Sequence, residues 1–279
     1  MNIFYAILLG IIQGLTEFLP VSSTAHLTLA GRLFGLIDPA RPEDWTAFIA
    51  IIQLGTVAAV IIYFFKDIIG MLTHGLHDLT TPASSNSSRW SVESRLAGKI
   101  IVGTLPVAVI GLAFKNIIEG ALTKEINVIG TSLIVLALIL WWAEKVGKRI
   151  RTEEQTTWKD GLIVGFAQSV ALIPGSSRSG TTITAGLFLG MTRETAARFS
   201  FLLSIPAVMA SGFFEIYEVR HHISSIGIVP LAISTIVSGI VGYATIAMLL
   251  KYLKTHTTYL FIFYRILIGA TLWVLYLNS

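Results

Sequence analysis

Long apolar runs separated by short polar segments dominate the 279-residue chain. A helix needs about 20 mostly apolar residues to cross the hydrocarbon core of a membrane. Six segments have that length: 45–65, 98–115, 126–144, 196–217, 227–250 and 258–277. The pattern predicts an all-α polytopic membrane protein with six transmembrane helices, built as one integral membrane domain over 1–279.

Two further apolar stretches, 3–35 and 160–191, are each broken near the middle by proline and small polar residues. The breaks read Pro20-Val21-Ser22-Ser23-Thr24 and Pro174-Gly175-Ser176-Ser177-Arg178-Ser179-Gly180. Each half is too short to span a membrane, which favours re-entrant hairpins that enter and leave on one face. One long kinked span in each stretch is the alternative.

The polar segments and the cations give an orientation. Segment 66–97 reads as a solvent loop of loosely defined structure, and 145–160 is a second polar loop. Of the 20 Lys and Arg residues, two lie in apolar segments, 13 fall on the side of these loops, and five fall on the other side: Arg32, Arg41, Lys115, Lys124 and Arg220. Cytoplasmic loops carry the excess of cations, so both termini are expected on the outer side.

An internal repeat divides the chain into halves of about 1–145 and 158–279. Gly10-x-x-Gln13 followed by Pro20-x-Ser22-Ser23 recurs as Gly165-x-x-Gln168 followed by Pro174-x-Ser176-Ser177. Three expected spans follow each copy, and an odd number inverts the second copy in the membrane. Inverted repeats with broken helices place a binding site near the midplane. Chance recurrence of small polar residues is the alternative.

Composition agrees with this reading. The chain is 54% hydrophobic and 13% charged, about half the charge of a soluble domain. It contains no Cys, which excludes disulfides, thiol nucleophiles and Cys-ligated metals. The net charge of +4 suits loops that face anionic lipid and does not indicate a nucleic-acid partner. ATP-binding and zinc-protease motifs are missing from the sequence.

Isolated charges mark the two broken stretches. Glu17 is the only acid in the first, and Arg178 is the only charged residue between 161 and 191. A charge at the bilayer centre costs at least about 2.5 kcal/mol, so the two are expected to pair. A purely structural ion pair is the alternative. Arg265, in the last apolar segment, also needs a partner and is interpreted as structural, and Gln53 and Thr56 as interhelical hydrogen-bonding or cavity-lining residues.

Small polar residues at the breaks predict an anion site. One of Ser22, Ser23 and Thr24 is expected to cap a new helix, and Ser176 and Ser177 to do the same in the second stretch. Two helix N-termini beside a guanidinium suit phosphate or diphosphate. His26 follows Ser23 by three residues and is expected within reach of its hydroxyl. Together with Glu17 these are the parts of an activated nucleophile, although a membrane His is often only an interhelical hydrogen-bonding residue.

These residues resemble the bacterial undecaprenyl-diphosphate phosphatases of the bacitracin-resistance family. The family's first pattern appears as Gln13, Glu17 and Phe18 through Thr24. Its second appears as Pro174, Gly175, Ser177, Arg178, Ser179 and Thr182. Ile-Gln-Leu-Gly at 52–55 and Tyr-Arg at 264–265 also look like the family, and the resemblance covers essentially the whole chain.

The resemblance implies hydrolysis of undecaprenyl diphosphate at the outer face of the bacterial cytoplasmic membrane, which recycles the lipid carrier for peptidoglycan synthesis. It makes Ser23 the candidate nucleophile, His26 a general base or acid, Glu17 a metal or proton-handling group, and Arg178, Ser177 and Thr24 a phosphate clamp. The remaining motif residues are candidate substrate-binding residues: Gln13, Ser22, Ser176, Ser179 and Thr182. A divalent cation, Mg²⁺ or Ca²⁺, is the implied cofactor.

Two departures and one rival function qualify this reading. Gln13 stands where many members have Glu, which puts a metal held by two carboxylates in doubt, and Ala25 stands where Gly is common. The rival is a secondary transporter or flippase for a lipid phosphate or another anion, because broken helices in inverted repeats are typical of transporters. The expected partners are the polyprenyl diphosphate and membrane lipid, with a second copy of the chain as a candidate.

Overall fold

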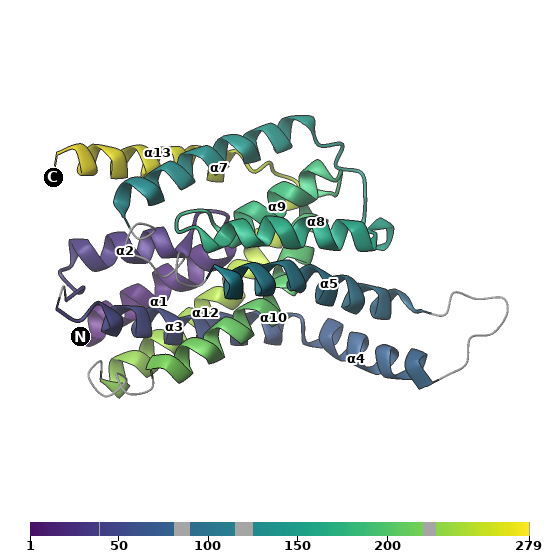
Figure 1. Ribbon diagram of the computed structural model, residues 1–279, viewed down its shortest axis with the longest axis horizontal. Coiled ribbons are helices and arrows are strands. Elements are labelled where there is room, and N and C mark those ends of the chain that lie inside the picture. The colour runs from purple at the N-terminus through teal and green to yellow at the C-terminus, as the bar shows by residue number, and fades with distance from the viewer. Residues whose placement is uncertain (39, 81–89, 115–124, 220–226, 279) are drawn as a thin grey trace.

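The computed structural model describes residues 1–38, 40–80, 90–114, 125–219 and 227–278 (Figure 1). Across these residues the chain is helical, and the one strand-type pairing is an isolated bridge between Arg151 and Met191. The α-helices are α1 Ile3–Phe18, α2 Ser23–Leu33, α3 Pro42–Tyr63, α4 Phe65–Thr80, α5 Val92–Ala113, α7 Ile126–Val146, α8 Trp158–Ser169, α9 Arg178–Phe188, α10 Arg193–Val219, α12 Ile228–Leu253 and α13 Tyr259–Leu277. Short 3₁₀ turns occupy η2 Glu153–Gln155 and η3 Val170–Leu172.

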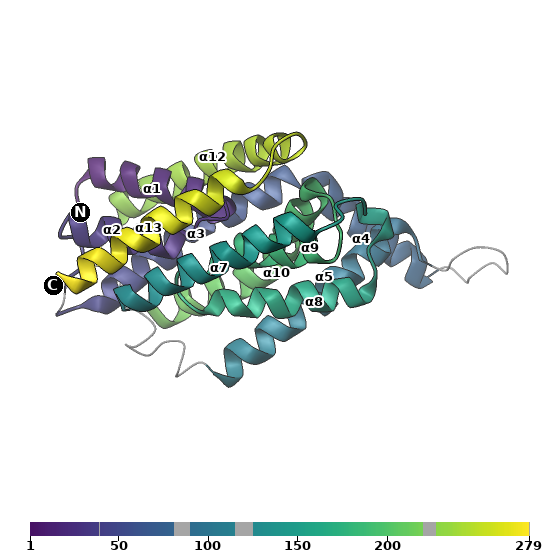
Figure 2. The same ribbon diagram turned by 90° about the horizontal axis from the view of Figure 1, so that it is seen from above.

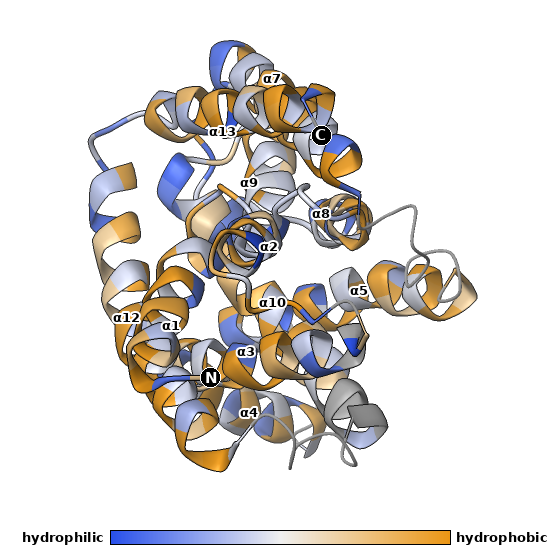
Figure 3. Ribbon diagram, turned by 90° about the vertical axis from the view of Figure 1, so that its left-hand side faces the viewer, coloured by the Kyte–Doolittle hydropathy of each residue, from blue (hydrophilic) through white to orange (hydrophobic). Residues whose placement is uncertain are grey.

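Five of these helices are long and apolar enough to cross a membrane: α3, α5, α7, α12 and α13. The sixth expected span, 196–217, lies within the 27-residue α10. Hydrophobic residues make up much of the peripheral helices, which are largely orange in the end-on view coloured by hydropathy (Figure 3). On α5, for example, Ile101, Leu105, Val109 and Leu112 are more than half exposed at helical spacing. The protein is therefore an all-α, multi-pass membrane protein whose outer surface faces lipid.

The two broken stretches form helix pairs that enter the bundle from opposite ends. In Figure 1, the start of α1 and the end of α2 lie at the left, near both termini, whereas the start of α8 and the end of α9 lie at the right. The connections after α3, α7, α9 and α12 also lie at the right-hand end. The two polar segments predicted to share a side thus share an end. The start of α8 and the end of α9 also share that end, as a re-entrant hairpin requires.

Proline ends the first helix of each pair. Leu19 and Ile173 precede Pro20 and Pro174, and both are extended, with ψ of 141° and 120°. The proline ring disfavours the helical region for the residue before it, so α1 ends at this point and the second pair leaves helical geometry at Ile173.

The repeat in the sequence is also a repeat in backbone geometry. Ser22 and Ser177 cap α2 and α9 with φ of 75° and 65°, and both helices have 11 residues. Each helix then ends in a matching turn with a left-handed glycine, Gly35 and Gly190. The structure therefore aligns Ser22 with Ser177, and the sequence alignment that placed Ser176 opposite Ser22 is wrong by one residue because the second break is one residue longer after its proline.

Each hairpin packs on a helix from the other part of the chain. The contacts pair α1 with α12 and α8 with α5, and these pairs lie side by side in both views (Figures 1 and 2). Glycines permit the close approach: a Cβ added at Gly165 of α8 would lie 2.1 Å from the carbonyl oxygen of Gly103 on α5. These contacts hold the two breaks in the middle of the bundle.

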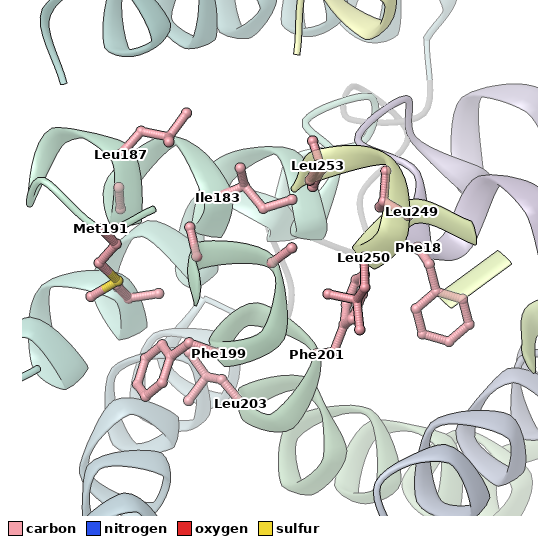
Figure 4. Packing of buried hydrophobic residues seen from close by; sticks show 14 of the residues in the cluster. Phe18, Ile183, Leu187, Met191, Phe199, Phe201, Leu203, Leu249, Leu250 and Leu253 are labelled. Atoms are coloured by element: carbon pink, nitrogen blue, oxygen red, sulfur yellow. The ribbon is translucent and has the colours of Figure 1, made fainter. Parts of the chain in front are cut away.

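The main apolar core lies beside the breaks. Phe18, at the end of α1, packs edge-on against Phe201 of α10 with ring centroids 5.3 Å apart. Leu249 and Leu250 of α12 and Ile183 of α9 surround this contact (Figure 4). Phe18, which follows Glu17 in sequence, is thus anchored in close-packed surroundings.

The interpretation of 66–97 as a loosely structured loop is wrong. Residues 65–80 form α4, and α5 begins at Val92; residues 81–89 lie outside the described part of the chain, as do Lys115, Lys124 and Arg220. The missed signal is the apolar spacing of Ile69, Leu72, Leu76 and Leu79, which is helical and leaves all four side chains exposed on one stripe.

A carboxylate joins α4 to the start of α5. Asp78 accepts hydrogen bonds from the Ser91 N–H at 2.7 Å and the Ser94 hydroxyl at 2.6 Å. The Ser94 and Ser91 hydrogen bonds hold the pKa of Asp78 well below its ordinary value. The same end of the bundle carries a bidentate pair between Arg151 and Asp160, whose hydrogen bonds raise the pKa of Arg151.

Candidate active site

A cavity of about 200 Å³ lies between the two breaks. Its polar lining comes from both hairpins: Gln13, Thr16, Glu17, Ser22, Ser23, Thr24, Gln168, Ser177 and Arg178. Spans α3 and α10 add Gln53 and Ser211, and apolar walls come from Ile49, Val107, Ala171, Leu172, Ala207 and Val208. The cavity thus offers polar groups at the breaks and apolar surface beside them, a combination suited to a ligand with a polar head and an apolar chain.

The predicted pairing of the two isolated charges is confirmed. Glu17 Oε1 accepts from Arg178 Nη2 at 3.0 Å, and the two side chains are 8% and 13% exposed. Arg178 also reaches the carbonyl oxygen of Ser200 at 3.5 Å. The salt bridge ties the end of α1 to the start of α9 and places a guanidinium at the cavity wall.

Ser23 is hydrogen-bonded to the same carboxylate. Its Oγ donates to Glu17 Oε2 at 2.8 Å, and Gln13 Nε2 donates to the same oxygen at 3.2 Å. Gln13 lies one helical turn before Glu17 and also contacts Thr56 of α3 at 3.4 Å. Glu17 therefore receives an alcohol, an amide and a guanidinium, and it is the group placed to take a proton from Ser23.

The expectation that His26 lies against Ser23 differs from the structure. His26 Nδ1 is 2.7 Å from the carbonyl oxygen of Ser22, and Nε2 is 2.7 Å from the Tyr264 hydroxyl. Its ring stacks on that of Tyr264 with centroids 5.4 Å apart. The i, i+3 spacing does place the two residues on neighbouring positions of α2, but both imidazole nitrogens are engaged elsewhere, so His26 supports the break instead of the hydroxyl.

Both breaks present helix N-termini, as expected. The hydroxyls of Ser22 and Ser177 accept from the N–H groups of Ala25 and Gly180, at 3.4 and 3.2 Å. The first-turn N–H groups of Ser23 and Arg178 have no intrahelical acceptor, because a helix leaves its first four donors free. Backbone donors and positive dipole ends thus adjoin the cavity from both hairpins.

Three residues expected to bind substrate lie outside the cavity lining. Ser176, Ser179 and Thr182 are each fully buried. Ser179 donates to the carbonyl oxygen of Leu19 at 3.0 Å, and Thr182 contacts the hydroxyl of Ser200 at 2.6 Å. In this structure the Ser179 and Thr182 hydroxyls hold the second hairpin against the first hairpin and α10, whereas the Ser176 hydroxyl has no hydrogen-bond partner among the described residues.

Arg265 links the two breaks from behind. It is fully buried, and its guanidinium donates to the carbonyl oxygens of Ser176 at 2.9 Å and Pro20 at 3.5 Å. Its Nε has no hydrogen-bond partner among the described residues. The structural role predicted for Arg265 fits this position, since removal of the side chain would free both carbonyls.

Sequence reasoning missed Gln168, Thr16 and Ser211 as cavity residues, and it listed Gln168 only as a part of the repeat. The repeat contains a signal that finds two of them: Gln168 and Ser211 follow Gln13 and Thr56 by 155 residues. Because Gln13 and Thr56 meet at the first hairpin, their counterparts were candidates for the same cavity.

The cavity lining offers few ligands for a divalent cation. The described residues contain no cluster of three acidic or His side chains. One carboxylate, Glu17, is present, and the buried Oε1 of Gln13, one turn away, has no partner in the described part of the chain. Two oxygen donors fit a hard cation that takes its remaining ligands from phosphate and water.

Comparison with known proteins agrees with the motifs. Residues 6–271 match the family described as the bacitracin resistance protein BacA. A protein of Syntrophobacter fumaroxidans named undecaprenyl-diphosphatase is 52% identical over 277 residues, which cover 99% of this chain and 98% of that protein. Proteins of the same name from Chloroherpeton thalassium and Chlorobium phaeobacteroides are each 50% identical, with 95% or more of both chains covered.

Proposed function

The chain belongs to the bacitracin resistance protein family, and from that premise we propose that it hydrolyses undecaprenyl diphosphate to undecaprenyl phosphate and inorganic phosphate. The observation that carries the proposal is the hydrogen bond from Ser23 to Glu17, at a cavity where Arg178 and two helix N-termini converge. The reaction returns the lipid carrier to peptidoglycan synthesis.

The phosphates bind where positive charge is concentrated. Arg178 and the first-turn N–H groups of α2 and α9 donate to phosphate oxygens. They also stabilise the charge that develops on these oxygens as the phosphorus is attacked. The polyprenyl chain leaves the cavity along its apolar walls into lipid.

Ser23 acts as the nucleophile and Glu17 as its base. As Oγ attacks the terminal phosphorus, its proton passes to Glu17. The bond from that phosphorus to the bridging oxygen breaks, and undecaprenyl phosphate leaves with the electron pair and takes the proton. Water then attacks the phosphoserine, gives a proton to Glu17 and releases phosphate, while Ser23 regains its proton. Direct attack by water uses the same residues.

The positioning role belongs to His26. Its contacts to the Ser22 carbonyl and to Tyr264 fix the start of α2, where the nucleophile is the first helical residue. A divalent cation, Mg²⁺ or Ca²⁺, would be held by Glu17 and Gln13, and its chemistry would be neutralisation of phosphate charge. Thr24 and Ser22 are further phosphate donors of the first break.

The distribution of cations supports an orientation in the membrane. We place the protein in the bacterial cytoplasmic membrane, with the cation-rich end of the bundle in the cytoplasm and both termini outside. The two halves are proposed to be inverted-topology repeats, consistent with hairpins that enter from opposite ends (Figure 1). A homodimer stays a prediction.

Phosphate release tests the function against the transporter alternative. Purified protein in detergent is incubated with a polyprenyl diphosphate, and free phosphate is measured for the wild type and for Ser23→Ala. We expect release by the wild type and a loss of at least about 100-fold in the variant. Binding without release by the wild type would favour transport, which needs only the anion site. Near-normal release by Ser23→Ala would favour direct attack by water.

A further inference from the structure

Among the polar side chains that line the cavity, the Gln168 amide has the fewest hydrogen bonds for its degree of burial. Gln168 lies on α8, its side chain is 1% exposed, and it faces the cavity. Neither its Oε1 nor its Nε2 has a hydrogen-bond partner among the residues that the structure describes. Most buried side-chain polar atoms are hydrogen-bonded, so an amide left open at both ends indicates a ligand that completes it.

Its counterpart in the repeat explains why this amide is open. Gln13 donates from Nε2 to Glu17 and Thr56. The residue that matches Glu17 in the second hairpin is Leu172. The second copy has therefore kept the amide and lacks the carboxylate that would accept from it, so Gln168 Nε2 is available to an acceptor that arrives from outside the protein.

The surroundings identify the class of acceptor. Gln168 lines the same cavity as Ser23, Arg178 and the two capped helix starts, which suit an anionic oxygen. It forms no hydrogen bond with Ser23, Glu17 or Arg178 in the described structure. Because Gln168 is outside the hydrogen-bond network that surrounds Ser23, the phosphate next to the attacked one is its expected partner.

We propose that Gln168 is a substrate-binding residue that holds the phosphate retained on the lipid, by donating from Nε2 to one of its non-bridging oxygens. The inference rests on the proposed function and assigns the diphosphate to two places: the terminal phosphate at Ser23 and Arg178, and the lipid-linked phosphate at Gln168. A neutral donor holds the second phosphate without competing with Arg178 for the Glu17 carboxylate. Gln13 and Gln168, which occupy equivalent positions in the repeat, thus bind different partners.

The test measures binding of small probes and does not depend on turnover. Affinities for methylenediphosphonate, which fills both places, and for methylphosphonate, which fills one, are measured calorimetrically on detergent-purified protein. We expect Gln168→Leu to weaken methylenediphosphonate binding by about tenfold, because a hydrogen bond to a charged group is lost. Methylphosphonate binding is expected to change by less than about twofold. Gln168→Glu, which opposes the phosphate charge, is expected to weaken methylenediphosphonate binding further.

Controls separate the outcomes. Gln155→Leu removes an exposed amide of η2 that bonds to Thr152, outside the cavity, and should leave both affinities unchanged. Equal weakening of both probes by Gln168→Leu, or no weakening of either, would overturn the proposal. If Gln168→Leu does not fold, Gln168→Glu and Gln168→Asn give the same comparison. Wild-type protein that binds methylenediphosphonate but releases no phosphate from lipid would refute the phosphatase function and leave this test intact.

Discussion

At the residue scale, the two serine caps hold an unusual backbone conformation next to the site. Ser22 and Ser177 have positive φ, which costs about 1–3 kcal/mol for a residue with a side chain. Such geometry persists only where surrounding contacts enforce it, and here Arg265 binds carbonyls of both breaks. The strain directs the free N–H groups of α2 and α9 to the cavity, which ties backbone geometry to anion binding.

Variants of the Glu17–Arg178 pair can distinguish its contribution to stability from its contribution to activity. We expect Arg178→Ala to lower the free energy of unfolding by about 2–4 kcal/mol, because it leaves a mostly buried carboxylate without its cation. The double variant Glu17→Gln with Arg178→Met should recover much of that loss while phosphate release stays abolished. Thermal denaturation in detergent and a phosphate assay check the two halves of this prediction. Recovery of activity in the double variant would show that the pair is only structural.

Gln13 offers a test of the cation. Gln13→Glu places a second carboxylate beside Glu17, where the amide now donates at 3.2 Å. Without divalent cation the like charges should destabilise the protein, and with it the added negative ligand should lower the concentration for half-maximal activity by roughly tenfold. Titration of Mg²⁺ or Ca²⁺ into chelator-treated protein measures this. An unchanged cation requirement would place the cation elsewhere or remove it from the reaction.

At the scale of elements, α4 is an amphipathic helix that two carboxylates attach to the bundle: Asp67 pairs with Arg198 of α10, and Asp78 accepts hydrogen bonds at the start of α5. Its exposed stripe includes Ile69, Leu72 and Leu76, and Asp78 joins it to the start of α5. Asp78 is not among the residues that line the cavity, so this attachment is separate from the reaction.

Asp78 makes the attachment dependent on pH. Its pKa in the folded protein is below the ordinary value of 3.8, so its stabilising effect is complete above about pH 4 and is lost as the pH falls through the folded pKa. We expect Asp78→Asn to increase amide hydrogen exchange in 65–80 at neutral pH, and to leave phosphate release within about twofold. Wild-type protein should show the same increase only at acid pH. Equal protection in both proteins at neutral pH would contradict the prediction.

At the scale of the whole molecule, one buried carboxylate joins three spans. Glu144 of α7 is 1% exposed, and it accepts from Arg193 Nε of α10 and from the Thr258 hydroxyl at the start of α13, each at 2.8 Å. Arg149 adds a third donor at 3.1 Å. This network closes the cation-rich end of the bundle.

Removal of the Glu144 carboxylate should destabilise the whole protein. We expect Glu144→Gln to lower the free energy of unfolding by about 2–3 kcal/mol, less than for a fully buried pair because both arginines are partly exposed. The exposed pair of Lys254 with Glu194 is the control, and Lys254→Ala should change stability by less than about 1 kcal/mol. Denaturation of both variants in the same detergent gives the comparison; equal effects would mean that burial is irrelevant here.

The sequence was most informative where physical costs are large. Charges in a membrane and prolines in helices are expensive, so Glu17 with Arg178, and the two breaks, were predictable from the chain. The hydrogen-bond partners of His26 were not predictable. An i, i+3 spacing brings two residues together but does not select among competing partners, and Tyr264 is 238 residues away along the chain. The α4 helix was missed because polar composition was weighed above periodicity. The one-residue difference between the breaks became visible only through the backbone angles of the caps.

Each hairpin packs on a helix from the other half of the chain, and this has a consequence for biosynthesis. Helix α1 packs on α12, which begins at Ile228, so the ribosome must add about 210 residues before the first hairpin meets its final neighbour. At typical translation rates this takes on the order of tens of seconds. Until residue 178 is made, Glu17 lacks Arg178, and until α12 follows, the first hairpin lacks its packing neighbour, so the polar break must stay near water or the insertion machinery. The second hairpin, by contrast, emerges when its partner α5 is already in the membrane, so the active site is completed only by the last quarter of the chain.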